Sequence, residues 1–219
     1  MRVALAWGSN SAGQCGTGEP DDLQSPSQVR TPAGHEPIAV EAGSEHSAII
    51  AASGALLTWG SNEHGQLGLG EDTAGRAAVV AVPCVVAALS GTPICAVACG
   101  SRHTLALSVA GAVYAWGSGA FGALGLGGDV RDERPLPMLV PAMRSPATQV
   151  ACGTHHSLAL TESGALLAWG WGQHGQLGDG AKGGYAFSPR AVGGLERCRV
   201  TAIASGDTCQ APSTPCPLL

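Results

Sequence analysis

A repeated unit of about 50 residues constrains the fold of this chain more than any other feature of its sequence. A Trp-Gly pair recurs at intervals of 52, 57 and 53 residues, at Trp7, Trp59, Trp116 and Trp169. A glycine cluster follows each pair, and it reads Gly13-Gln-Cys-Gly16, Gly65-Gln-Leu-Gly68, Gly122-Ala-Leu-Gly125 and Gly175-Gln-Leu-Gly178. A second marker precedes three of the tryptophans and contains a histidine followed by serine or threonine, at His46, His103 and His156. Several markers in a fixed order indicate an array of structural repeats.

The residues within one unit predict short antiparallel strands. Two apolar runs, 47–51 and 55–59, flank a Ser-Gly turn, which is the pattern of a β-hairpin. A more variable stretch with prolines then leads to further short runs, such as 79–82 and 94–99. No window has a sustained helical period. Four short strands per unit are typical of a propeller blade, so we predict an all-β propeller of four-stranded antiparallel blades.

Composition narrows the class of protein. The 219 residues include 33 glycines, only 12% are charged, and the net charge is −5. A nucleic-acid surface needs clusters of Lys and Arg, and Lys182 is the only lysine, so we expect no nucleic-acid partner. No apolar run is long enough to cross a membrane, and the run after Met1 is too short for a signal peptide. The eight cysteines lack zinc spacing. Because no secretory signal is recognised, we expect reduced thiols in a cytoplasmic or nuclear protein that is not secreted.

Taken together, these markers resemble the RCC1 repeat, named for the regulator of chromosome condensation. The family pattern is a Gly-x-x-His-Ser/Thr strand, a hairpin, Trp-Gly and Asn/Ser-x-x-Gly-Gln-Leu-Gly, and the resemblance runs from Val3 to about Thr208. It implies a seven-bladed propeller of four-stranded blades. The family's functions include nucleotide exchange on the GTPase Ran, scaffolding beside ubiquitin-ligase domains, ciliary transport and plant UV-B sensing. The repeat therefore predicts architecture better than activity.

The number of repeats predicts a propeller that is partial or open. The markers occupy 7–16, 43–68, 100–125, 153–178 and 206–209, so residues 1–209 hold about four blades where the family has seven. Residues 210–219 contain three prolines, and we predict a Pro-rich irregular tail because proline interrupts a central strand. The two incomplete end units could join into a fourth blade, the chain could remain an open arc, or another chain could close the ring.

The repeated residues themselves predict structural roles. The four tryptophans are expected to anchor neighbouring blades through their large apolar surfaces. The three marker histidines are expected to bond backbone near the hub, because no carboxylate or cysteine lies at a ligand spacing that would make them a metal site. Positive φ or close backbone approach is expected at six loop glycines, which are Gly65, Gly68, Gly122, Gly125, Gly175 and Gly178.

One position varies while its neighbours repeat. It holds Glu45, Arg102 and His155, and in the loops of the plant photoreceptor, which belongs to the family that the repeat resembles, this position is an arginine on one propeller face. Variation on a constant scaffold is typical of a binding rim. A further candidate for the rim is the acidic loop with Asp129, Asp132 and Glu133. The alternative for each residue is ordinary solvated surface.

Several kinds of chemistry lack the residues that they need. Two G-x-G-x-x-G strings, at 117–122 and 170–175, lack the following helix that a dinucleotide requires, so we interpret them as turns. No G-x-S-x-G elbow and no Cys–His arrangement predicts a nucleophile. The loop tryptophans of the photoreceptor are replaced by Ser44, Ser101 and Thr154, which argues against UV sensing by that mechanism. We expect no enzyme activity, no metal and no cofactor.

The predicted function is protein–protein interaction or scaffolding through a propeller face. The alternative that the resemblance implies is guanine-nucleotide exchange on a small Ras-like GTPase of the Ran type. A third hypothesis is a truncated product without independent function. The expected partner is a protein, such as a small GTPase or a ubiquitin-ligase component, and not a membrane. Open blade edges also predict self-association.

Overall fold

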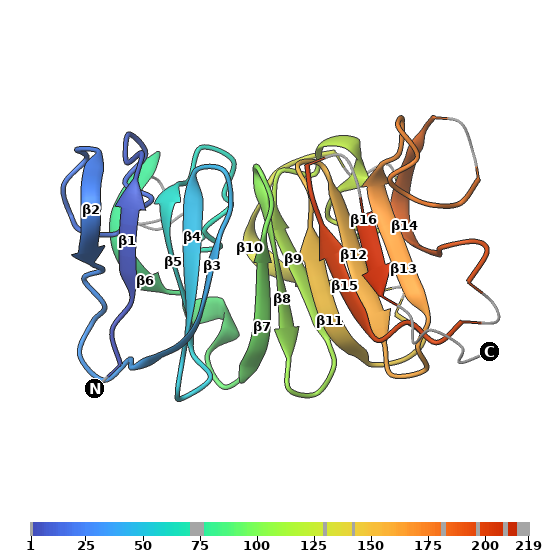
Figure 1. Ribbon diagram of the computed structural model, residues 1–219, viewed down its shortest axis with the longest axis horizontal. Coiled ribbons are helices and arrows are strands. Elements are labelled where there is room, and N and C mark those ends of the chain that lie inside the picture. Colours follow the sequence, from blue (N-terminus) through green and yellow to red (C-terminus); the bar gives the residue numbers. More distant parts are fainter. Residues whose placement is uncertain are drawn as a thin grey trace.

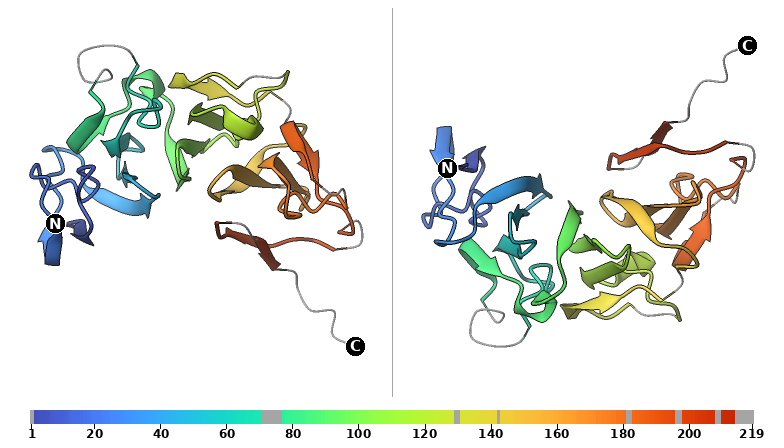
Figure 2. Two further views of the ribbon diagram at one scale, coloured as in Figure 1. Left: turned by 90° about the horizontal axis from the view of Figure 1, so that it is seen from above. Right: turned by 90° about the horizontal axis from the view of Figure 1, so that it is seen from below.

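The computed structural model describes residues 2–70, 77–128, 131–141, 143–180, 183–195, 198–207 and 210–213. These residues form five antiparallel sheets, three with four strands and two with two strands (Figure 1). The sheets stand side by side along an open arc, and the N-terminal and C-terminal sheets lie at its two ends (Figure 2). In the part of the chain that the structure describes, no helix is long and apolar enough to span a membrane.

Each four-stranded sheet is one blade, and its strands follow chain order from the inner edge outward. Blade 1 contains β3 (Pro37–Ala42), β4 (His46–Ala51), β5 (Leu56–Ser61) and β6 (Val79–Val85). Blade 2 contains β7 (Ile94–Cys99), β8 (His103–Ser108), β9 (Val113–Gly117) and β10 (Arg134–Leu139). Blade 3 contains β11 (Ala147–Cys152), β12 (His156–Thr161), β13 (Leu166–Trp171) and β14 (Tyr185–Ala191). The predicted all-β propeller of four-stranded antiparallel blades is confirmed, in the form of an open arc.

The central hairpin of each blade forms for the reason that the repeat predicts. In blade 1 the hairpin turns at Gly54, which has a φ of +81°, and its N–H donates to the carbonyl of Ala51 at 2.8 Å. Gly111 and Gly164 turn the corresponding hairpins of blades 2 and 3. The second strands β4, β8 and β12 are buried along their whole length, because both faces of a blade pack against neighbouring sheets.

The core lies between the blades. One apolar cluster joins blades 2 and 3 and includes Leu105 and Leu158. A second cluster joins blades 1 and 2 and includes Ile50 and Trp116, and a third packs Val29 against blade 1. Each blade therefore buries its apolar surface against its neighbours, as expected for a repeat protein whose stability comes from nearest-neighbour interfaces.

The two-stranded sheets correspond to complementary parts of one blade. The N-terminal half-blade, β1 (Leu5–Gly8) and β2 (Leu23–Gln28), matches the third and fourth strands, since Trp7 holds the place of Trp59 in β5. The C-terminal half-blade, β15 (Ala202–Ser205) and β16 (Gln210–Ser213), matches the first and second strands. The half-blades form separate sheets at opposite ends of the arc, so they do not join into a fourth blade within the chain (Figure 2).

The expectation of an irregular tail from residue 210 is wrong for its first part. Gln210–Ser213 pair with β15 in antiparallel register, with Pro212 opposite Ile203. Proline is compatible with this position because β16 is the edge strand of a two-stranded sheet, where the outer side of the backbone needs no donor. Residues 208–209 and 214–219 of the predicted boundary and tail lie outside the described residues.

Two short 3-10 helices that the sequence pattern does not predict lie in the connections, η1 (Ala87–Leu89) before β7 and η2 (Ala120–Gly122) after β9. Within η2, Phe121 has a φ of +60°, and it is the only residue other than glycine with positive φ among those described. Because η2 contacts β13 and β14, it places Phe121 at the junction of blades 2 and 3.

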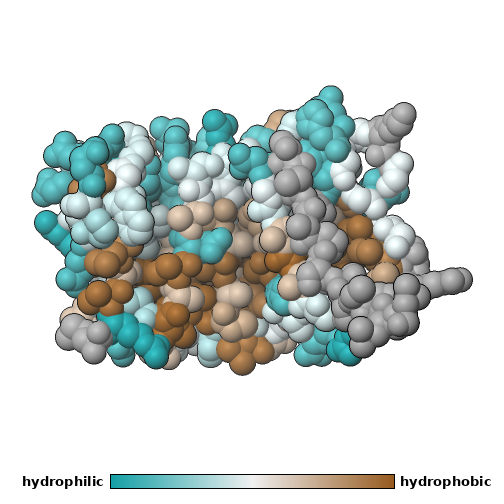
Figure 3. Space-filling view, in the orientation of Figure 1, coloured by the Kyte–Doolittle hydropathy of each residue, from teal (hydrophilic) through white to brown (hydrophobic). Residues whose placement is uncertain are grey.

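Apolar side chains remain exposed on the concave face of the arc. Figure 3 shows them as a band across the lower half of the face seen in Figure 1. Leu5 on β1, and Ile38 and Val40 on β3, are each more than half exposed. An open arc leaves this inner surface in contact with solvent.

Candidate functional site

A hydrogen-bonding unit recurs at three junctions between neighbouring sheets. The carbonyl of Gln66, in the loop after β5, accepts the indole N–H of Trp116 at 2.9 Å and the hydroxyl of Thr104 at 2.7 Å, both from blade 2. Equivalent sets occur at the two adjacent junctions, Gln14 with Trp59 and Ser47, and Ala123 with Trp169 and Ser157. The repeated tryptophan therefore anchors a blade through its polar N–H as well as its apolar ring.

Each marker histidine extends this unit into the following sheet. The Nε2 atoms lie 2.9 Å from a hydroxyl oxygen in three pairs, His46–Thr104, His103–Ser157 and His156–Ser205. The expectation of a backbone partner is wrong, because the partner is a side-chain hydroxyl one sheet further along. Since the Thr104 hydroxyl already donates its proton to Gln66, Nε2 of His46 must be the protonated ring nitrogen and donate to Thr104.

Burial keeps these three imidazoles neutral. Desolvation lowers the pKa of His46 and His156 to about 4, and that of His103 to about 3, with smaller effects from neighbouring histidines on His103 and His156. The Nδ1 atoms of His46 and His156 are buried without a hydrogen-bond partner. When the proton is on Nε2, Nδ1 carries only a lone pair, so no N–H group is buried without an acceptor. Among the described residues, no three His, Cys, Asp or Glu side chains gather as a metal ion would need.

The second glycine of a loop lies beneath the tryptophan of the next blade. A Cβ atom at Gly68 would lie 2.7 Å from Nε1 of Trp116, and one at Gly125 would lie 2.7 Å from Nε1 of Trp169. Positive φ is found at all six loop glycines of the prediction, Gly65, Gly68, Gly122, Gly125, Gly175 and Gly178. At Gly68 and Gly125, backbone conformation and the tryptophan contact both require glycine.

Trp7 does not anchor a blade in this structure, unlike the other three repeat tryptophans. Its side chain is 63% exposed, whereas Trp59 is 3% exposed and Trp116 and Trp169 are fully buried. The loop that receives each buried tryptophan comes from the preceding unit, and the structure places no such unit beside β1. The structure therefore does not show the predicted anchoring contact for Trp7.

The predicted rim residues share one backbone geometry. In each blade the carbonyl of the rim residue accepts, at 2.8–2.9 Å, the N–H of the residue two positions after the repeat tryptophan. The pairs are Glu45 with Ser61, Arg102 with Ser118, and His155 with Trp171. The three residues therefore lie at the same end of their blades. Glu45 and Arg102 are exposed, while His155 is half-buried. Desolvation, and then the Arg102 guanidinium, lowers the pKa of His155, so the structure brings these two rim residues together.

The acidic loop does not form one cluster with them. Asp129 lies outside the described residues. Asp132 is exposed and lies 3.9 Å from Arg134, and Glu133 Oε1 lies 2.6 Å from Nδ1 of His64 in the loop between β5 and β6. Glu133 therefore contacts the loop of blade 1.

The structure reveals an aromatic cluster at the rim between blades 2 and 3 that the sequence prediction missed. We define the rim aromatic cluster as Phe121, His155, Trp171, His174, Tyr185 and Phe187. The ring centroid of Phe121 lies 5.0 Å from His155, 5.5 Å from Tyr185 and 6.0 Å from Trp171. Phe121 is 37% exposed and Tyr185 is 41% exposed, so part of this surface faces solvent. The sequence carries one sign of this cluster, which is Trp171 at a position where the other units have serine.

Two arginines border the rim aromatic cluster. Arg102 is close enough to His155 to lower its pKa, and the guanidinium carbon of Arg131 lies 5.4 Å from the ring centroid of Phe187. This rim therefore combines exposed rings with positive charge, which is a chemistry suited to binding another molecule.

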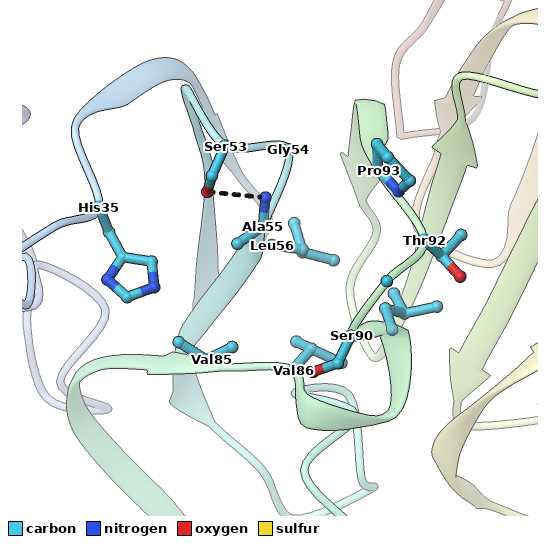
Figure 4. A pocket seen from close by; sticks show the side chains of 12 residues that line it. His35, Ser53, Gly54, Ala55, Leu56, Val85, Val86, Ser90, Thr92 and Pro93 are labelled. Carbon is cyan, nitrogen blue, oxygen red and sulfur yellow. Dashed lines mark hydrogen bonds between the residues drawn. The ribbon is translucent and has the colours of Figure 1, made fainter.

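The opposite end of the blades carries an open pocket of different character. Figure 4 shows it between the hairpin turn of blade 1 and the segment around η1, with Leu56, Val85 and Val86 among its lining residues. Ser53 accepts the N–H of Ala55 at 3.4 Å there, and His35 is the one titratable side chain of the lining. A single histidine in a largely apolar lining does not form a catalytic arrangement.

The fold and the junctions define the class of this protein as a repeat domain of the β-propeller type. The family model of the RCC1-like domain matches residues 3–212, and the chain belongs to this family. The predicted resemblance to the RCC1 repeat is confirmed over nearly the whole chain.

Relatives and solved structures agree with this assignment. The chain is 37% identical over 175 residues to the ultraviolet-B receptor UVR8 of Arabidopsis thaliana, covering 80% of this chain and 38% of the receptor. It is 36% identical over 204 residues to the human E3 ubiquitin-protein ligase HERC2, covering 92% of this chain and 4% of the ligase. The structure of human WBSCR16 matches with a TM-score of 0.85 at 25% identity, covering 97% of this chain and 53% of that chain. Yeast RCC1 (Prp20), solved with Kap60, matches with a TM-score of 0.86 at 22% identity, covering 97% and 50%. This chain spans well under two thirds of the length of these relatives.

Proposed function

We propose that this chain is a protein-interaction module that binds its partner through the rim aromatic cluster and the adjacent Arg102. The observation that supports this function most strongly is the exposure of Phe121 and Tyr185 at a rim where neither side chain belongs to the core clusters. Aromatic and arginine side chains contribute the largest share of binding free energy at protein interfaces. The relatives that carry ubiquitin-ligase names make a ligase component a reasonable partner class.

Affinity capture with a matched pair of variants tests the proposal. Trp171→Ser alters the rim cluster, and Val79→Ala alters the exposed residue of blade 1 that occupies the position of Tyr185. We expect a reproducible partner that is recovered by the wild-type chain and by Val79→Ala, and lost with Trp171→Ser. Recovery of the same proteins by all three forms would refute the rim as the binding surface. Recovery of no reproducible partner by the folded wild-type chain would refute the interaction module itself.

Guanine-nucleotide exchange on a small GTPase is the second candidate. It is supported by the fold similarity to yeast Prp20p, whose structure has a TM-score of 0.84 at 23% identity and is described together with its binding to Gsp1p. Exchange predicts faster release of labelled GDP from a small GTPase at catalytic amounts of this chain. An unchanged release rate across a panel of GTPases would exclude this candidate and leave the interaction module standing.

The proposal includes a cytoplasmic or nuclear location, which follows from the reduced state expected for the cysteines. Imaging of a fluorescently tagged chain in cells measures it. Accumulation in the secretory pathway would contradict this part of the proposal.

A further inference from the structure

We infer that the rim aromatic cluster binds an extended segment of a partner protein that carries an aromatic or leucine anchor flanked by carboxylates. This inference rests on the proposed interaction function and specifies the chemistry of the partner. Its support comes from departures of this chain from its own repeat, from backbone conformation and from local charge.

The first departure is Trp171. The corresponding residues of the other units are Ser9, Ser61 and Ser118, so the repeat does not need a large side chain at this position. Its neighbour across the strands departs as well. Trp171 pairs with Tyr185 in blade 3, whereas Ser61 pairs with Val79 at the same register in blade 1. Two adjacent positions have thus become aromatic together in one blade.

Blade 2 contributes a third departure to the same place. Phe121 precedes the first loop glycine, and His64 and His174 precede it in the neighbouring units. The Phe121 ring stacks on Tyr185 at an interplanar angle of 26° and is tilted by 33° against Trp171. Residues from η2, β13 and β14 therefore build one layered aromatic surface. In a repeat protein, departures that converge in space indicate selection for a local contact, because folding alone is served by the repeated residue.

The backbone at Phe121 supports the same conclusion. Positive φ is unfavourable for a residue with a Cβ, and among the described residues that are not glycine only Phe121 adopts it. Strained backbone of this kind gathers at binding sites, where the surrounding structure holds a side chain in a required position. Here it holds the Phe121 ring against His155, Tyr185 and Trp171.

The charge near the rim aromatic cluster indicates the charge of its partner. The chain as a whole carries a net charge of −5, yet two guanidinium groups lie near this cluster. Arg131 lies over the ring of Phe187, and the charge of Arg102 lowers the pKa of His155. The nearby carboxylate of Glu133 is bonded to His64 instead. Rings bordered by guanidinium groups in an acidic protein favour a segment whose apolar anchor stacks on the rings while its carboxylates face the arginines.

Selection from a random linear peptide library displayed on phage tests this inference. The full-length chain serves as the target, beside a variant that restores the repeat at three positions, Phe121→His, Trp171→Ser and Tyr185→Val. The neighbouring units already carry these residues, so we expect the variant to fold, and a cooperative unfolding transition verifies that it does. Val79→Ala is the control with an unaltered cluster, and Arg102→Glu tests the charge.

We expect the wild-type chain and Val79→Ala to enrich peptides with an aromatic or leucine residue next to Asp or Glu. Affinity for these peptides should fall about tenfold or more in the repeat-restored variant and severalfold in Arg102→Glu. Peptides that bind the repeat-restored variant equally well, or that are basic, would overturn the inference, as would the absence of any enrichment. Preferential binding of a single-stranded oligonucleotide, or self-association that the repeat-restored variant abolishes, would overturn it too. If the peptides are basic, bind the repeat-restored variant equally well or are not enriched at all, a partner recovered by affinity capture would still support the broader interaction function.

Discussion

Acidification should destabilise this protein through the three buried histidines of the blade junctions. In the unfolded chain an imidazole has a pKa of 6.5, whereas the folded protein lowers the pKa of His46 and His156 to about 4 and that of His103 to about 3. The unfolded state therefore binds protons first as the pH falls. Stability from these groups is fully present above pH 6.5 and is lost progressively as the pH falls towards the folded-state values.

The size of the effect follows from these pKa values. Between pH 7.5 and pH 5.5, each histidine removes about 1 kcal/mol from the free energy of unfolding, and the three together remove about 3–4 kcal/mol. A domain of ordinary stability has about 5–15 kcal/mol in total, so the loss is large. Desolvation and Arg102 also lower the pKa of His155, which adds to the loss in the same direction.

Urea unfolding at several pH values between 5 and 7.5 measures this loss. His103→Gln keeps a donor that can reach the hydroxyl of Ser157 but cannot titrate, so the pH dependence should fall by about one third. Val79→Ala changes an exposed side chain that does not titrate and should leave the dependence unchanged. Unfolding free energies that stay constant on acidification, or the same pH dependence in His103→Gln as in the wild type, would refute the assignment of neutral buried imidazoles.

The remaining predictions concern the junctions and the open edge. Gly68→Ala places a methyl group 2.7 Å from the indole nitrogen of Trp116 and should lower the free energy of unfolding by about 2–3 kcal/mol. Gly175→Ala, where no atom lies within 4 Å of the new methyl group, should lower it by only about 1 kcal/mol. Equal losses of the two variants in urea unfolding would contradict the contact between Gly68 and Trp116. Trp116→Phe removes the donor to the carbonyl of Gln66 and should cost about 1–3 kcal/mol by the same measurement, and an unchanged midpoint would show that this bond is dispensable. The exposed Trp7 at the free edge of β1 predicts concentration-dependent self-association in sedimentation experiments, which Trp7→Lys should weaken; identical masses for both forms would argue against this edge as the contact.

Much of the fold could be predicted from the sequence, because the repeated residues carry the contacts that define a blade. Trp116 and Gly68 recur at fixed spacing, and the structure packs one on the other across a blade junction. The acceptor of His103 could not be predicted in the same way, since Ser157 lies 54 residues away and only the stacking of two blades brings the two side chains together. The strand at Pro212 was missed because proline is excluded from central strands but tolerated at an edge.

The candidate site was harder to predict than the fold. Arg102 and His155 were found from their variation at one repeat position, and the structure places them close together. Phe121 and Tyr185 belong to different blades. Each replaces another aromatic or apolar residue of the repeat, so neither substitution alone indicates a binding site. Their common location became visible only when the blades were placed beside each other. The exposure of Trp7 likewise depends on a neighbour, because the other repeat tryptophans are buried by the unit that precedes them.

Amide hydrogen exchange of the chain, with and without a peptide selected on it, locates the surface that binds the partner. We expect the bound peptide to slow exchange at 118–122, 154–156, 171–175 and 185–187, the segments that build the rim aromatic cluster. Exchange at the Ser53–Gly54 turn and along β1 should remain unchanged. Protection confined to β1, or to the pocket around Ser53, would contradict the claim that this propeller binds its partner at the aromatic rim.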